Sequence, residues 1–133
     1  MKKVLALLTL FIATIGPFQF ANANTGEVAR AQFATAIEAR EPLDKVTILS
    51  NDVNKVYFFS ELRNLQGQSV THRWLLGGKV MAEVNFNVGG PRWRVNSSKT
   101  LLPGWIGDWT VAVVDNSGVV LSEYTFQYVE AGQ

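Results

Sequence analysis

His72-Arg73-Trp74, Gly89-Gly90-Pro91-Arg92-Trp93-Arg94 and Pro103-Gly104-Trp105-Ile106-Gly107-Asp108-Trp109 mark out the stretch that decides the fold. This stretch holds all four tryptophans, the single histidine and three of the six arginines. A buried aromatic side chain covers about 150–250 Å², so the stretch supplies much of any core. Its polar residues are also the first candidates for a functional site.

Two runs inside this stretch, residues 70–75 and 80–88, indicate a β-hairpin because they are separated by a glycine pair and alternate in polarity. A one-residue change of register would move every side chain to the other face. A two-residue loop would place Trp74 beside Met81, on the polar side. A three-residue loop, residues 76–78, would place Trp74 beside Val80. We expect the three-residue loop, because it buries Trp74 with the valines.

Similar short runs continue outward in both directions, and no helical period is convincing. The run from Val56 to Leu62 is apolar nearly throughout, as in a central strand that is covered on both faces. Turn residues separate the runs, which lie at 28–37, 46–49, 56–62, 70–75, 80–88, 92–96, 108–114 and from 120 onward. About seven to eight short strands at regular spacing predict an all-β fold, an immunoglobulin-like antiparallel β-sandwich, with a small barrel as the alternative.

Residues 1–23 are expected to form a cleavable secretory signal peptide. Lys2 and Lys3 precede an apolar run of about a dozen residues, which fits a signal core of ~7–15 residues and is shorter than the ~20 of a membrane-spanning helix. Ala21-Asn22-Ala23 has the pattern of a cleavage site. The alternative is a retained N-terminal anchor. We expect a single β-sandwich domain at 24–133, in the periplasm or secreted, with no transmembrane helix after signal removal.

Composition excludes several classes of function. After residue 23, ten Lys and Arg residues stand against eleven acids, so the mature chain lacks the basic excess that nucleic-acid binding needs. The chain has no cysteine, so thiolate metal sites, cysteine nucleophiles, disulfides and a lipid anchor on cysteine are not expected. A single histidine also excludes a multi-histidine metal site. We expect no metal and no cofactor.

Several blocks follow one another along the chain: Ala29-Arg30-Ala31-Gln32-Phe33, Arg40-Glu41-Pro42, Tyr57-Phe58-Phe59-Ser60-Glu61-Leu62, Thr71-His72-Arg73-Trp74, Pro91-Arg92-Trp93-Arg94-Val95, Ser97-Ser98-Lys99 and Gly107-Asp108-Trp109-Thr110-Val111. Together they resemble the bacterial "domain of unknown function 2914" family, over essentially all of the chain after the signal. The resemblance implies an exported or membrane-tethered β domain of Gram-negative bacteria. It implies no activity.

Catalytic chemistry is not predicted. A catalytic histidine needs a nucleophile and an orienting carboxylate within reach, but no Gly-x-Ser-x-Gly motif occurs and no acid lies near Ser97 or Ser98 in sequence. The expected register places His72 on the core side, which favours a hydrogen-bonded structural histidine. The acids available for a glycosidase pair lie on unrelated strand ends or exposed positions: Glu41, Glu61, Glu83 and Asp108.

An anion-binding patch is the more promising hypothesis. Guanidinium groups bind carboxylate or phosphate with two parallel hydrogen bonds. Four cations are expected to point outward and to share a face near the long loop: Arg73, Arg92, Arg94 and Lys99. Such a patch would take an acidic glycan, a lipid headgroup or a partner protein. The alternative is that they pair with Glu61, Glu83 and Asp108 on a solvated sheet face.

Trp105 completes the set of predicted binding residues. It lies between Gly104 and Gly107 on the long loop, where it could stand exposed as a platform for a sugar or a protein, or fold back as a lid on the sandwich. The sequence thus predicts a non-catalytic envelope module that binds a protein or an acidic glycan. A structural module of an envelope assembly and an unrecognised hydrolase are the alternatives.

Overall fold

The computed structural model describes residues 26–132. The predicted signal peptide, residues 1–23, lies outside them. Within this range there is no helix, and therefore none long and apolar enough to cross a membrane. The strands are β1 (Glu27–Ala34), β2 (Ile37–Glu38), β3 (Glu41–Pro42), β4 (Ile48–Ser50), β5 (Lys55–Arg63), β6 (Ser69–Leu76), β7 (Lys79–Asn87), β8 (Arg92–Thr100), β9 (Gly107–Val114) and β10 (Val120–Val129).

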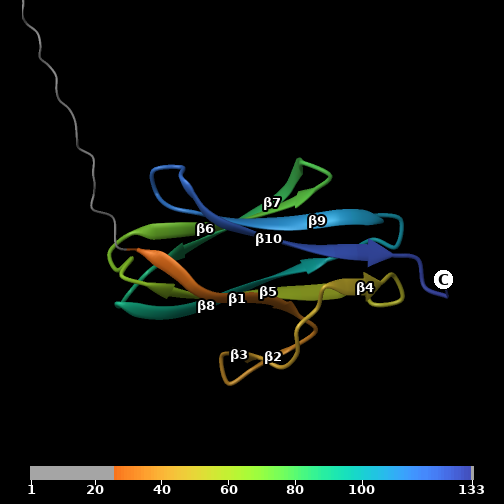
Figure 1. The fold of residues 1–133 in the computed structure, drawn as a ribbon, viewed down its shortest axis with the longest axis horizontal. Helices are drawn as coiled ribbons and strands as arrows, with labels where there is room; N and C mark the ends of the chain where they lie inside the picture. Colours follow the sequence, from red (N-terminus) through yellow and green to blue (C-terminus); the bar gives the residue numbers. More distant parts are fainter. Residues whose placement is uncertain (1–25, 133) are drawn as a thin grey trace, which may run out of the picture.

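Two sheets face each other as layers, which confirms the predicted all-β sandwich (Figure 1). One sheet has the order β1-β5-β8 and the other the order β4-β10-β9-β6-β7. The pairing within both layers is antiparallel, as predicted, except at the three-residue β4, which lies parallel to β10. The small β2–β3 hairpin lies outside the two layers, against the outer face of the three-stranded sheet (Figure 1).

The core between the sheets is built from large aromatic residues. Trp74 and Trp109 are fully buried, and the Phe33 ring contacts the rings of Phe126 and Phe58 with centroids 4.7 and 5.0 Å apart. Offset and edge-to-face contacts of this kind add about 0.5–1.5 kcal/mol to the free energy gained by burial. The core therefore fixes the position of one sheet relative to the other. The outer faces of the sheets are not needed for this packing and can carry polar residues.

The prediction of a three-residue loop in the β6–β7 hairpin is wrong. Leu76 pairs with Lys79, so the loop consists of Gly77 and Gly78 alone. Both glycines have positive φ, 57° and 88°, as a tight hairpin turn with left-handed residues requires. The twist of such a turn matches that of the two strands, which explains why two residues are enough here.

A bulge in β7 nevertheless places Trp74, on the core face of β6, beside Ala82. The register shifts between Trp74 and Leu75, so that Trp74 pairs with Ala82 and Leu75 pairs with Val80. Met81 is the additional residue, and it packs partly against the core. Val80, predicted to lie inward, is instead 50% exposed. One extra residue reverses the alternation of a strand, and this reversal compensates for the shorter loop.

Candidate functional site

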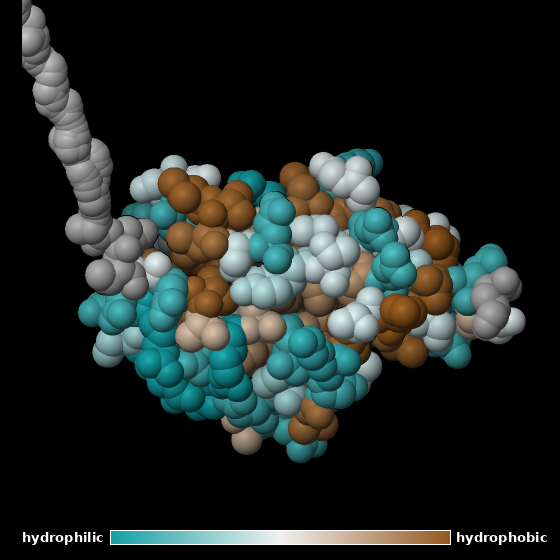
Figure 2. Space-filling model, viewed as in Figure 1, coloured by the Kyte–Doolittle hydropathy of each residue, from teal (hydrophilic) through white to brown (hydrophobic). Residues whose placement is uncertain are grey.

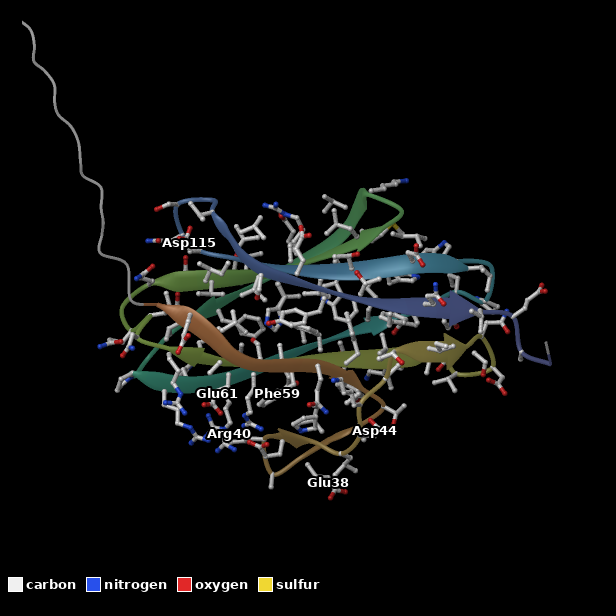
Figure 3. All side chains as sticks on the ribbon, in the orientation of Figure 1. Glu38, Arg40, Asp44, Phe59, Glu61 and Asp115 are labelled. Atoms are coloured by element: carbon white, nitrogen blue, oxygen red, sulfur yellow. The ribbon has the colours of Figure 1, made fainter. Side chains whose placement is uncertain are left out.

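The central strand β5 places a glutamate in an unusual position. Its residues alternate between the core and the outer face, as Leu62 is buried in the core while Phe59 and Glu61 point the other way, toward the β2–β3 hairpin (Figure 3). Both outward residues are nonetheless buried, Phe59 at 1% and Glu61 at 2% exposure. A buried carboxylate is costly unless it is paired and hydrogen-bonded, so its partners define the site.

The segment that carries the β2–β3 hairpin is anchored to β1 by Asp44. The Asp44 carboxylate accepts hydrogen bonds from the Thr35 backbone N–H at 2.8 Å and from the Thr35 hydroxyl at 2.5 Å. The Gln32 side-chain amide donates to the Asp44 carbonyl at 2.7 Å. At the tip, Ala39 and Arg40 have φ of 50° and 66°, a conformation that costs non-glycine residues roughly 1–2 kcal/mol each. These contacts hold the hairpin over the outer face.

Strand pairing surrounds Glu61 with arginines. In one row across the sheet, Arg30 of β1 and Arg94 of β8 lie on either side of Glu61, and in the next row Arg63 lies beside Arg92. The Glu61 carboxylate accepts hydrogen bonds from Arg30 Nη2 at 2.8 Å, from Arg63 Nε at 2.7 Å and from Arg92 Nη2 at 3.3 Å. The Arg30 guanidinium also lies 5.0 Å above the Phe59 ring.

A second glutamate joins the same network from the hairpin. Glu41 of β3 accepts two hydrogen bonds from Arg30, both 2.9 Å, and one from Arg94 Nη1 at 2.5 Å. Arg30 thus bridges the two carboxylates. We refer to the six residues of this network as the arginine–glutamate cluster: Arg30, Glu41, Glu61, Arg63, Arg92 and Arg94. In Figure 2 the lower left of the view is hydrophilic, in the area where Figure 3 labels Glu61 and Arg40.

The arginines keep both carboxylates ionised. Hydrogen bonds from Arg30, followed by those from Arg63 and Arg92, lower the pKa of Glu61 to about 2, against the opposing effect of burial. Hydrogen bonds from Arg30 and Arg94 likewise lower the pKa of Glu41 to about 2. In return, the pKa of Arg30 is raised above its usual value, chiefly by its hydrogen bonds to Glu41 and then to Glu61. At neutral pH neither carboxyl group is available as a general acid.

Positive charge is in excess within the cluster. Four guanidinium groups surround two carboxylates, which leaves a net charge of +2. Arg92 has the most spare capacity, because its side chain is 52% exposed and contacts Glu61 only through Nη2 at 3.3 Å. Its remaining side-chain N–H groups have no partner among residues 26–132. A guanidinium group in this state can donate hydrogen bonds to an external carboxylate or phosphate.

The predicted shared face for the four cations is wrong for two of them. Arg92 and Arg94 lie together in the cluster, but Arg73 lies on the other sheet and pairs with Glu83 at 2.7 Å. Lys99 pairs across the sheet with the core residue Val56, so it has the inward parity of β8 rather than the outward one. The alternative of simple ion pairing therefore holds for Arg73 with Glu83 and for Arg92 with Glu61, whereas Asp108 pairs with none of these cations.

Trp105 and Lys99 meet at the opposite end of β8 from Arg92. The Lys99 ammonium lies 5.2 Å above the Trp105 ring, whose centroid is 6.0 Å from that of Trp109. The Trp105 carbonyl accepts a hydrogen bond from Trp109 Nε1 at 3.0 Å. Trp105 is half-buried and packs against the core. Of its two predicted positions, it adopts that of a lid on the sandwich.

His72 is buried in the core, as predicted. Its ring nitrogens lie 2.8 Å from the Ser60 hydroxyl and 2.7 Å from the Ser97 hydroxyl, and the Trp74 indole N–H donates to Ser97 at 3.1 Å. Ser97, which lies just beyond the strand expected at residues 92–96, is a buried residue of β8. Burial lowers the pKa of His72 to about 3. His72 contacts no carboxylate within residues 26–132, so this chain of hydrogen bonds serves to satisfy buried polar groups.

Two other kinds of site can be compared with the cluster. A pocket of about 180 Å³ opens between β1 and β10, lined in part by Phe33, Lys45 and Tyr124, and it is smaller than the 300–1,000 Å³ usual for small-molecule sites. In the described part of the chain, no three His, Asp or Glu side chains gather where they could hold a metal ion. The arginine–glutamate cluster is thus the strongest candidate.

The fold and the cluster together define a β-sandwich domain with an arginine-rich ion-pair network on one outer face. The model of a family described as "Protein of unknown function (DUF2914)" matches residues 67–128, from the turn before β6 into β10. The chain is therefore similar to this family over that range, and the predicted resemblance is confirmed there. The blocks before residue 67 lie outside the match. A comparison with curated proteins gave no match.

Proposed function

We propose that the protein is a non-catalytic binding module of the cell envelope that holds an acidic ligand on the arginine–glutamate cluster. The observation that carries the proposal is the excess of four guanidinium groups over two carboxylates, with Arg92 half exposed. The buried Glu61 orients the arginines, because its carboxylate forms ion pairs with three of them, Arg30, Arg63 and Arg92. Preorganised donors lose less side-chain entropy when a ligand binds.

The distribution of charge supports the same proposal. After residue 23, the Lys and Arg residues outside the cluster number six, against nine acids. The cluster is therefore a positive area on an otherwise negative domain. Such an arrangement attracts acidic ligands to one face and disfavours their approach elsewhere.

A catalytic role finds little support in the chemistry of the site. Glu41 and Glu61 stay ionised because arginines lower the pKa of each to about 2, and general acid–base catalysis works best with a pKa near the working pH. His72, the other candidate, is fully buried beside Ser60 and Ser97. Binding is the function that these groups serve best.

The envelope location is the part of the proposal that rests on the sequence. Lys2, Lys3, the apolar run and Ala21-Asn22-Ala23 support export, and a domain without cysteine needs no disulfide in an oxidising compartment. Mass spectrometry of the protein from the periplasmic fraction should find an N-terminus at Asn24. Recovery of the uncleaved chain in the cytoplasm would contradict export.

The ligand-binding part is tested with poly-L-glutamate by isothermal titration calorimetry at low ionic strength. The variant Arg92→Gln with Arg94→Gln should bind the polymer at least about tenfold more weakly than the wild type, because each charge-assisted hydrogen bond contributes roughly 1.5–3 kcal/mol. The matched control, Arg73→Gln with Lys79→Gln, removes the same charge from the other sheet and should bind like the wild type.

Two results would overturn the proposal. If the control variant loses as much affinity as the cluster variant, only net charge matters and the cluster is not a site. If the wild type does not bind poly-L-glutamate under these conditions, the arginines serve the fold alone.

A further inference from the structure

The two main sheets have four edge strands, and three of these have features that hinder pairing with a further strand. Edge strands expose unpaired backbone groups, and proteins usually protect them by shortness, bulges or cover. Strand β4 has three residues, β1 has a register shift and a bridge from Phe33 to Val46, and β7 has a bulge at Met81. Strand β8 has nine residues and pairs with β5 without a register shift. Of the edges that the structure describes, β8 is the one suited to receive another strand.

The hydrogen bonds that flank β8 show which of its backbone groups face away from β5. Asn64 N donates to Pro91 O at 2.8 Å and Leu101 N donates to Asn54 O at 2.9 Å. In an antiparallel pair, hydrogen-bonded and non-hydrogen-bonded residue pairs alternate, so the residues of β8 that are bonded to β5 have odd numbers. The N–H and C=O groups that point to the free edge belong to Arg92, Arg94, Asn96 and Ser98.

The same four residues carry their side chains on the outer face, with the cluster. Side chains on one face of a strand recur about every 6.6 Å, at every second residue. A strand that pairs with β8 would place its own side chains about 4.5–5.5 Å from them. Acidic residues at alternate positions of such a strand would therefore lie opposite Arg92 and Arg94. Strand β8 itself contains no acid.

We propose that the acidic ligand is an extended segment of a partner protein, with acidic residues at alternate positions, which pairs as an added strand with the free edge of β8. This inference rests on the proposed function and names the ligand of the same site. Main-chain hydrogen bonds supply affinity in this mode of recognition, and side chains at alternate positions supply specificity. Here Arg92 and Arg94 form ion pairs with the acidic side chains of the segment. The backbone groups of Asn96 and Ser98 form hydrogen bonds with its main chain.

A proline in β8 separates strand pairing from charge attraction. Asn96→Pro removes an edge N–H and leaves the ladder with β5 intact, since proline is tolerated where the N–H faces outward. The probe is a short synthetic peptide of alternating glutamate and threonine. Asn96→Pro should bind it about tenfold or more weakly than the control Asn96→Ala, while inorganic polyphosphate, which has no backbone to pair, should bind both variants equally.

A measurement on the wild-type protein removes any dependence on how the variant folds. The peptide should slow amide hydrogen exchange at Arg94, Asn96 and Ser98, and an analogue that is N-methylated at alternate residues should lose this effect. If Asn96→Pro and Asn96→Ala bind the peptide equally, or if the edge amides exchange unchanged, strand pairing is wrong while the cluster can still bind anions. Failure of Arg92→Gln with Arg94→Gln to weaken either probe would instead overturn the proposed function.

Discussion

Glu61 is a buried anion whose stability depends on its neighbours. Its carboxylate is 2% exposed, and Arg30, Arg63 and Arg92 all reach it within 3.3 Å. Removing one member of a buried ion pair costs more than the pair contributes, because the remaining charge is left without compensation. Here the remaining charges are half-exposed guanidinium groups that water can reach, so the cost is reduced.

We expect Glu61→Gln to lower the free energy of unfolding by about 1–3 kcal/mol, measured by urea denaturation. The control is Glu83→Gln, which breaks the exposed pair with Arg73 and should cost less than about 1 kcal/mol. Equal losses in the two variants would show that Glu61 contributes no more than a surface pair.

His72 makes stability depend on pH in a window of its own. Its folded pKa of about 3 lies below the ordinary value of 6.5 because burial disfavours the charged ring. Between these two pH values His72 is protonated in the unfolded chain but not in the folded chain. The free energy of unfolding therefore falls as the pH drops below 6.5. Glu41 and Glu61, whose folded pKa values are about 2, contribute stability that is lost only as pH falls below 4.5.

Between pH 6.5 and 4.5 we expect the free energy of unfolding to fall by about 2 kcal/mol, from denaturation curves at each pH. In His72→Gln the same interval should be nearly flat, although the variant is less stable throughout. A wild-type curve that is flat in this window, or an equal slope in the variant, would contradict a buried neutral histidine.

At the scale of the elements, the connection from β7 to β8 depends on the absence of one side chain. A Cβ atom on Gly89 would lie 2.8 Å from Trp93 Cη2 and 3.1 Å from Cζ2, whereas on Gly90 the nearest atom would be 3.5 Å away. The indole ring is partly buried against the core and cannot move without losing contacts.

Gly89→Ala should therefore destabilise the protein by about 1–2 kcal/mol, in the range found for overpacked sites. Gly90→Ala, with only ordinary contact distances, should change stability by less than about 1 kcal/mol in either direction. Thermal denaturation of the two variants side by side measures the difference. Equal effects would mean that Trp93 shifts freely.

The strands were predictable because alternation is a local property. The run from Val56 to Leu62 was expected to be covered on both faces, and β5 is. The length of the β6–β7 loop was not predictable from alternation. A two-residue turn with a bulge at Met81 and a three-residue turn without a bulge both place the apolar face of β7 beside Trp74. The alternation in sequence does not distinguish these two arrangements.

The cluster was predictable only in part. Arg92 and Arg94 were expected to point outward, but Arg30 was missed because nothing local says that β1 and β8 both flank β5. Arg63, on β5 itself, was also missed. Parity alone could have shown that Glu61 and Arg63 share a face of β5. The contribution of Glu41 depends on a hairpin of two-residue strands, which is too short to show a period.

In the molecule as a whole, the two sheets have different roles. The five-stranded sheet supplies most of the tryptophan core, and the three-stranded sheet carries four of the six arginines on its outer face. We propose that the acidic ligand binds to this outer face and is not held by the domain's net charge alone. The two sheets offer an internal comparison, because Arg73 lies on the opposite one.

The most direct test is NMR of the arginine side chains during titration with poly-L-glutamate. We expect the Nε–Hε resonances of Arg92 and Arg94 to shift with a common saturation curve, while that of Arg73 stays in place. A shift of Arg73 equal to theirs, or no shift at Arg92 and Arg94, would contradict the proposal.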